Sequence, residues 1–146
     1  MVRLVFIFFF SFSMAFPMLA QTKINWKTLQ DVDWSEKYNE EYDANFHYPN
    51  FGESVKELEG QEIIIKGFML IMESEATFHI LSRYPLASCF FCGAAGPDSI
   101  VQLELKPGHP KFTIDQRVAI RGKLKLNQDD FDQCNFILTD AEPYTK

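Results

Sequence analysis

The sequence is short of basic residues. Its 146 residues hold 14 Lys and Arg against 20 Asp and Glu, a formal net charge of −6 at pH 7. Nucleic-acid surfaces need clustered Lys and Arg to neutralise phosphates, and anionic membranes attract polybasic segments. The composition therefore argues against nucleic acid as a partner and against docking on anionic lipid head groups.

Motifs of common catalytic machineries are also missing. The chain has no glycine-rich phosphate loop and no Ser-His-Asp set with a nucleophile elbow. His47 and His109 lie beside proline in turn-like surroundings, and Glu73 and Glu75 fall in a predicted turn without signs of burial. These absences favour a binding protein over an enzyme.

Cysteine is scarce, with only Cys89, Cys92 and Cys134. In an oxidising compartment thiols pair unless a metal or a reductase holds them. Because three is an odd number, one thiol stays free, all three share a role, or one pairs between chains.

Long apolar runs are confined to the N-terminus. Residues 1–20 contain Arg3, then an apolar run over residues 4–16, and end at Ala20. This order of charge, apolar stretch and small residue is typical of a signal peptide, and the run is shorter than the roughly 20 residues of a transmembrane helix. We expect cleavage after Ala20 and a periplasmic or secreted protein without stable membrane insertion. An uncleaved N-terminal anchor is the alternative.

Residues 21–51 differ from the rest of the chain. Their apolar residues, such as Trp26 and Trp34, are sparse and aromatic, and they follow neither a helical nor a strand period. We predict an extended N-terminal arm with one short helical turn, which docks its tryptophans on the main domain. A disordered leader is the alternative.

Residues 52–146 carry the alternation of β-strands. Five segments are predicted to be strands, at residues 62–72, 76–83, 100–106, 118–126 and 134–139. The first is a long run rich in β-branched residues, and apolar and polar residues alternate cleanly in residues 100–106 and 118–126. Isolated glycines, Gly67 and Gly122, interrupt two of the five segments and indicate bulges or sharp bends. The pattern predicts a mainly β fold, a small five-stranded Greek-key barrel like the oligonucleotide/oligosaccharide-binding (OB) fold. Other small barrels or sandwiches fit the same strand count.

The loop between the second and third predicted strands carries the most distinctive chemistry. Cys89 and Cys92 are separated by two residues and followed by glycine, which can turn both sulfurs to one side. Such pairs are typical of zinc knuckles, with zinc–sulfur distances of about 2.3 Å. A closed zinc site needs four ligands, and we predict His79 and Cys134 as the other two. Copper(I) is the second choice of metal because thiolates are soft ligands.

Two other interpretations of this loop stay open. The spacing is that of thiol-disulfide oxidoreductases, although no helix is predicted after Cys89 to activate its thiol. Alternatively, a local disulfide braces the loop, and its small ring adds little stability. Between the cysteines, either Phe90 or Phe91 is exposed at the loop tip to recognise a partner, or both are buried.

The run over residues 85–97, with the pattern P-x-A-S-C-F-F-C-G-x-A-G-P, resembles the signature of a bacterial exported family, the domain of unknown function DUF3299. The resemblance implies a small secreted or periplasmic β module, with Cys89 and Cys92 as the positions carried over and Cys134 outside the motif. It implies no established reaction. Three further segments resemble the family: Trp26 with Leu29, residues 65–70 and residues 138–142.

We therefore predict a non-enzymatic exported binding module. It would hold zinc, or else copper, in the Cys89/Cys92 loop and serve an envelope or membrane-transport partner. The alternatives are a thiol-disulfide redox protein and a structural adaptor. In the adaptor, a disulfide braces the loop and the aromatic arm around Trp26 and Trp34 contacts the partner.

Overall fold

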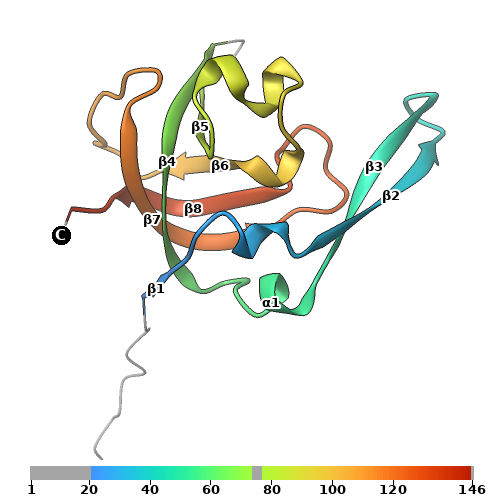
Figure 1. Ribbon diagram of the computed structural model, residues 1–146, viewed down its shortest axis with the longest axis horizontal. Helices are drawn as coiled ribbons and strands as arrows, with labels where there is room; N and C mark the ends of the chain where they lie inside the picture. Colours follow the sequence, from blue (N-terminus) through green and yellow to red (C-terminus); the bar gives the residue numbers. More distant parts are fainter. Residues whose placement is uncertain (1–20, 74–76, 146) are drawn as a thin grey trace, which may run out of the picture.

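The computed structural model describes residues 21–73 and 77–145, so the predicted signal peptide and the first residue of the second predicted strand lie outside it (Figure 1). Five strands form a closed barrel in the order β4-β5-β6-β8-β7, and β7 pairs again with β4. The β6–β8 pair is parallel and the other barrel pairs are antiparallel. The predicted mainly β, OB-like barrel is confirmed. Its strands are β4 (Glu62–Glu73), β5 (Thr77–Ser82), β6 (Ile100–Leu105), β7 (Arg117–Leu126) and β8 (Phe136–Pro143).

The barrel interior is filled by alternate residues of each strand. Val101 and Leu103 on β6, and Ile120 and Leu124 on β7, are buried there as the alternation predicts. Each such side chain contributes about 1.5–3 kcal/mol when it is removed from water. Because strand alternation has a period of two, it also fixes which residues face outward, where the candidate sites lie.

Both predicted bends occur at glycines that have no room for a side chain. A Cβ at Gly67 would lie 2.5 Å from the carbonyl oxygen of Ser82 and 3.0 Å from the ring of Trp26. A Cβ at Gly122 would lie 2.8 Å from the carbonyl oxygen of Thr139, where the β7–β8 register shifts. The glycines let the long strands curl into a small barrel.

The N-terminal arm is extended, with one helical turn, and part of it pairs with itself. β2 and β3 form an antiparallel hairpin that projects from the barrel (Figure 1). The sequence did not predict this hairpin, because neither of its faces carries a continuous apolar row. Trp26 packs on the barrel core, whereas Trp34 lies half-buried on the hairpin. The arm's elements are β1 (Thr22–Lys23), η1 (Thr28–Gln30), β2 (Val32–Asn39) and β3 (Ala44–Phe51), followed by α1 (Glu53–Lys56).

The cysteine loop covers the outside of the barrel. It forms three short 3-10 turns, η2 (Leu86–Ser88), η3 (Phe90–Cys92) and η4 (Pro97–Ser99). Beneath it lies a second apolar cluster built on the outward residues Leu70, Ile80, Cys89 and Ile100. Across residues 21–73 and 77–145, no helix is long and apolar enough to cross a membrane.

Candidate functional site

The cysteine loop brings Cys89 and Cys92 together through a tight turn. Gly93 ends η3 in the left-handed conformation, and the Cys92 amide donates to the Cys89 carbonyl at 3.2 Å. Cys89 is buried in the outer apolar cluster, whereas Cys92 is exposed and its thiol donates to the Leu86 carbonyl at 2.9 Å. Both cysteines are free thiols on the same tight turn. They could therefore bond to one another or to one ion.

Neither the Cys92 thiol nor the Cys134 thiol is activated as a nucleophile. Partial desolvation by the packed loop, and then the neighbouring Cys89 side chain, raises the pKa of Cys92. Burial raises the pKa of Cys134 to about 11. Because reactive cysteines of thiol oxidoreductases have lowered pKa values, these surroundings give no support to thiol-disulfide catalysis.

The predicted metal ligands fall into two groups. Cys134 packs against the same outer cluster as Cys89. On β5, His79 precedes the outward-facing Ile80 and therefore lies on the opposite face of the strand. Its ring lies 5.3 Å from that of His109. Burial, and then His109, lowers the pKa of His79. In the part of the chain that the structure describes, no group of three or more His, Cys, Asp or Glu side chains could hold a metal ion.

An apolar groove of about 460 Å³, called here the aromatic groove, runs beside the cysteine loop. Phe78 and Phe91 on its walls are large side chains left 38% and 43% exposed. The lining comes from four separate parts of the chain, one of which contributes His47 alone. Its main apolar members are Met72, Phe78, Ile80, Phe90, Phe91, Ile100, Phe131 and Cys134.

The loop over residues 127–135 forms one wall of the aromatic groove and contacts the hairpin. The Phe131 ring lies 4.3 Å from that of Phe46, 5.3 Å from that of Tyr48 and 5.9 Å from that of Tyr42. Gln128 also donates a hydrogen bond to the Pro49 carbonyl at 3.0 Å. This contact gives the hairpin a definite position beside the groove.

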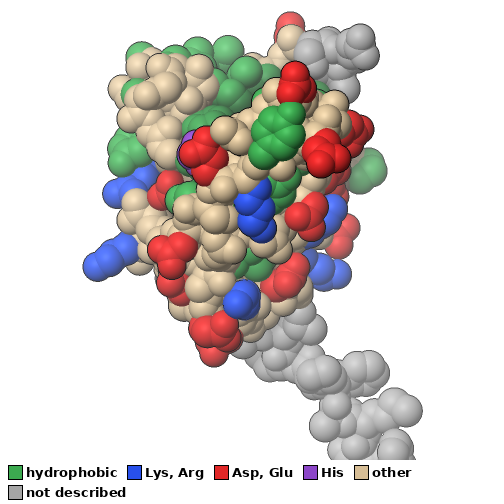
Figure 2. Space-filling model, turned by 90° about the vertical axis from the view of Figure 1, so that its right-hand side faces the viewer, with side chains coloured by type: hydrophobic (Ala, Val, Ile, Leu, Met, Phe, Trp, Pro, Cys, Tyr) green, Lys and Arg blue, Asp and Glu red, His purple; other side chains and the backbone are tan. Residues whose placement is uncertain are grey.

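The aromatic groove is acidic. Glu73, Asp130 and Asp132 line it, and neither Lys nor Arg does. Figure 2 faces the hairpin end of the molecule and shows acidic side chains spread widely over it, with hydrophobic side chains exposed between them. Since charged groups at a rim select partners of opposite sign, the groove suits a cationic, apolar ligand.

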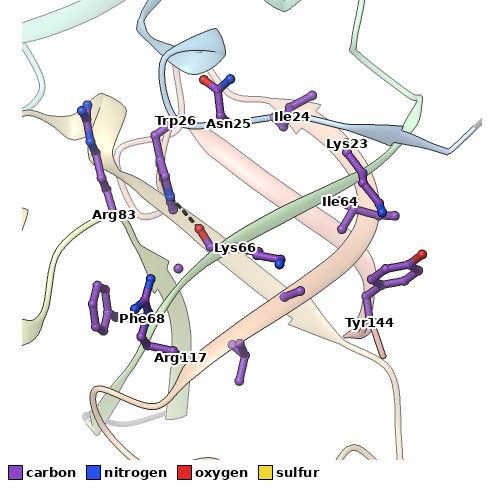
Figure 3. Close-up of a pocket in the computed structure, with 13 residues that line it drawn as sticks. Lys23, Ile24, Asn25, Trp26, Ile64, Lys66, Phe68, Arg83, Arg117 and Tyr144 are labelled. Carbon is purple, nitrogen blue, oxygen red and sulfur yellow. Dashed lines mark hydrogen bonds between the residues drawn. The ribbon is translucent and has the colours of Figure 1, made fainter. Parts of the chain in front are cut away.

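A second pocket, of about 730 Å³, has the opposite charge (Figure 3). Trp26 lies within it, and its indole N–H donates to the Lys66 carbonyl at 2.7 Å. This basic pocket was not predicted from the sequence, because its four cations are far apart in the chain and no local charge cluster marks them. They are Lys23, Lys66, Arg83 and Arg117.

Fold and surface together define a small closed OB-type barrel with a projecting hairpin and a loop that covers its outer face. The chain is similar in structure to a DUF3299 family protein from Pseudomonas aeruginosa PAO1, with a TM-score of 0.51 and 16% sequence identity. The match covers 87% of this chain and 98% of that one. No protein-family model and no curated protein matches the sequence. The likeness shows a shared fold and agrees with the resemblance noted in the sequence.

Proposed function

We propose that the protein is a non-catalytic binding module of the DUF3299 kind, and that its aromatic groove captures an apolar, positively charged polypeptide segment of a partner. The groove itself is the observation that carries this proposal. Contiguous exposed apolar surface in a concave site, with polar groups at the rim, is typical of recognition sites.

The composition of the groove argues for a polypeptide ligand. Phe78, Phe91 and Phe131 offer aromatic surface of the kind that dominates binding energy in protein interfaces. The three carboxylates favour Lys or Arg in the ligand. A fatty acid or phospholipid would instead bring its own negative charge against them.

We further propose that the module acts after export, in the periplasm or outside the cell, for a partner in envelope assembly or membrane transport. The leader-like residues 1–20 support this location. Expression in a bacterial host, followed by mass measurement of the exported chain, tests it. A mature protein beginning at Gln21 is expected, and a chain that keeps its first twenty residues would contradict cleavage.

Peptide binding tests the proposed function. The probe is a short fluorescein-labelled peptide of alternating leucine and lysine, measured by fluorescence anisotropy. We expect Phe91→Ser and Phe78→Ser to weaken binding at least about tenfold, as loss of aromatic anchors does. The matched control is Ile114→Ser, because Ile114 is 51% exposed and lies outside the groove.

Two results would contradict the aromatic groove as the peptide-binding site. Equal weakening by Ile114→Ser would show nonspecific apolar contact. Preference for a leucine and glutamate peptide over the lysine peptide would show that the acidic rim does not select the ligand. Either result removes the groove as the binding site.

A second candidate function, the binding of a thiophilic metal, is favoured by the position of Cys89 and Cys92 on one tight turn. Two neighbouring thiolates suit copper(I), whereas a zinc site needs more donors than this pair supplies. Native mass spectrometry of protein purified without reductant or chelator tests it. One bound ion, lost in the Cys89→Ser, Cys92→Ser double variant, is expected. A metal-free mass two hydrogens lower would instead show a disulfide, and an unmodified mass would show free thiols.

A further inference from the structure

Four cationic side chains converge on the basic pocket of this acidic protein. Lys23 comes from β1, Lys66 from β4, Arg83 from just after β5, and Arg117 from the start of β7. They meet because β4 pairs with all three of the other strands. The cation cluster is therefore a product of the topology.

These cations lack acidic partners within residues 21–73 and 77–145. The ion pairs found there use Lys56, Lys106, Arg121 and Lys123. No Asp or Glu lines the pocket. Like charges facing one cavity repel one another, so an entering anion would relieve an unfavourable arrangement.

Aromatic rings hold three of the cations in place. A ring face attracts a cation without neutralising its charge, so the cation is positioned and still available to a ligand. The contacts join Arg117 to the Phe68 ring at 5.4 Å, Lys23 to the Tyr144 ring at 5.5 Å and Arg83 to the Tyr84 ring at 5.2 Å.

The position of Trp26 in the pocket is fixed. Its indole hydrogen bonds to the Lys66 carbonyl and packs over Gly67, which has no side chain to push it away. Trp26 thus offers a flat apolar surface among the cations. In Figure 3 the indole lies between Arg83 on one side and Lys66 on the other, with Phe68 and Arg117 below it.

We propose that the basic pocket binds a phosphomonoester whose organic part is planar or apolar. Several cations around one cavity favour a dianion, and the guanidinium fork matches phosphate oxygens with paired hydrogen bonds. Trp26, Phe68 and Tyr144 supply the apolar walls. The volume lies within the range of about 300–1,000 Å³ that is usual for small-molecule sites.

The first experiment uses Trp26 as the reporter. The chain has two tryptophans, so the mature protein with Trp34→Phe leaves Trp26 as the only one. Phenyl phosphate, inorganic phosphate and phenol are titrated while tryptophan emission is followed. We expect saturable binding of phenyl phosphate, weaker binding of inorganic phosphate and none of phenol. An equal response to phenol, or no saturable response to phenyl phosphate, would overturn the proposal.

Charge-matched variants show whether the pocket is responsible. Lys66→Gln with Arg117→Gln removes two pocket charges, whereas Lys111→Gln with Lys125→Gln removes two exposed charges elsewhere. We expect only the first pair to weaken phenyl phosphate binding, at least about tenfold. Equal weakening by both pairs would show general charge attraction and remove the site. If the pocket pair does not fold, Lys23→Gln on the short exposed strand β1 replaces it.

Vesicles separate the two sources of a phosphate group. Co-sedimentation is measured with phosphatidylcholine vesicles that contain phosphatidic acid and with pure phosphatidylcholine vesicles. Binding only to the first kind, lost in the pocket variant, would identify a lipid head group, and phenyl phosphate binding without vesicle binding would identify a soluble ester. If the protein binds neither phenyl phosphate nor the vesicles with phosphatidic acid, the proposal is wrong. Because the two pockets share no lining residue, peptide binding in the aromatic groove should be unaffected by the pocket variant.

Discussion

At the scale of the residue, Gly67 shows how the arm and the barrel constrain each other. It lies within β4, and the Ser82 carbonyl and the Trp26 ring both crowd the position that a Cβ would take. The first of these neighbours is backbone, which cannot move aside as the end of a flexible side chain can. One missing Cβ therefore permits both the curvature of the strand and the docking of the indole.

We predict that Gly67→Ala lowers the free energy of unfolding by about 1–3 kcal/mol, the usual cost of an overpacked site. Urea denaturation measures it. Gly96→Ala is the control, because its nearest neighbour is the end of the Asp98 side chain, which can rotate away. Equal losses at the two positions would show that the crowding at Gly67 is not the cause.

His79 predicts a dependence of stability on pH. Burial first, and the His109 ring second, lower its pKa below the ordinary 6.5, so the folded state holds that proton less tightly than the unfolded chain does. Stability should therefore fall as the pH drops through about 6.5 and level off below the folded pKa. Urea denaturation between about pH 7.5 and 5.5 measures this, and His79→Leu should flatten the curve. An unchanged slope in that variant would assign the effect to other groups.

A second pH window belongs to Glu142. Its hydrogen bonds to Lys106, the larger cause, and to Arg121 lower the pKa of its carboxyl below the ordinary 4.5. The stability that these contacts supply is present above that value and is lost as the pH falls through the lowered pKa. Glu142→Gln should thus reduce the acid sensitivity below about pH 4.5 without altering the window of His79.

At the scale of the element, the loop over residues 127–135 connects the hairpin to the aromatic groove. Asn127 holds this loop closed through side-chain hydrogen bonds to three of its carbonyls, those of Asp130, Gln133 and Cys134. Phe131 then contacts the rings of the hairpin. The Phe131 ring cluster thus joins the outer part of the hairpin to this loop, while Val32 and Phe51 pack its base on the barrel core.

We predict that Phe131→Ala increases amide hydrogen exchange in β2 and β3 at least about tenfold while exchange in β4 and β7 stays nearly constant. Removing the ring leaves the hairpin few apolar contacts, whereas the barrel strands remain paired on both sides. The same variant should weaken peptide binding in the groove. Uniform faster exchange throughout the chain would show global destabilisation instead.

The elements also show what the sequence could and could not predict. The five barrel strands were predicted correctly because β7 alternates apolar with polar residues, whereas β4 is a long run rich in β-branched residues, which favour strands. The hairpin escaped prediction because it lies mostly in solvent and its order depends on Phe131, about eighty residues later in the sequence. The basic pocket was not predicted for a related reason. Only strand pairing brings Lys23 and Arg117 to the same pocket.

At the scale of the whole molecule, the two pockets divide the surface by charge. The aromatic groove is lined by three carboxylates and the basic pocket by four cations, within a chain of net charge −6. Their linings share no residue. A single small barrel thus presents two concave surfaces of opposite charge.

We predict that the two surfaces bind independently. The affinity for the leucine and lysine peptide should change by less than about twofold when phenyl phosphate saturates the basic pocket, because a coupling free energy needs two states that both ligands bias. Isothermal titration of the peptide with and without phenyl phosphate measures this. A several-fold change would reveal coupling through β4, which contributes residues to both linings.

Barrel closure also bears on how copies of the protein meet. β7 and β8 pair, and β7 pairs again with β4, so the barrel strands leave little free backbone edge for another chain. The hairpin is different, because β2 and β3 pair only with each other in the described residues. Its outer edges carry charged residues such as Glu36 and Lys37, which discourage strand addition. At high protein concentration, unwanted self-association would therefore begin at the hairpin, and the charges along it act as a barrier to fibre growth.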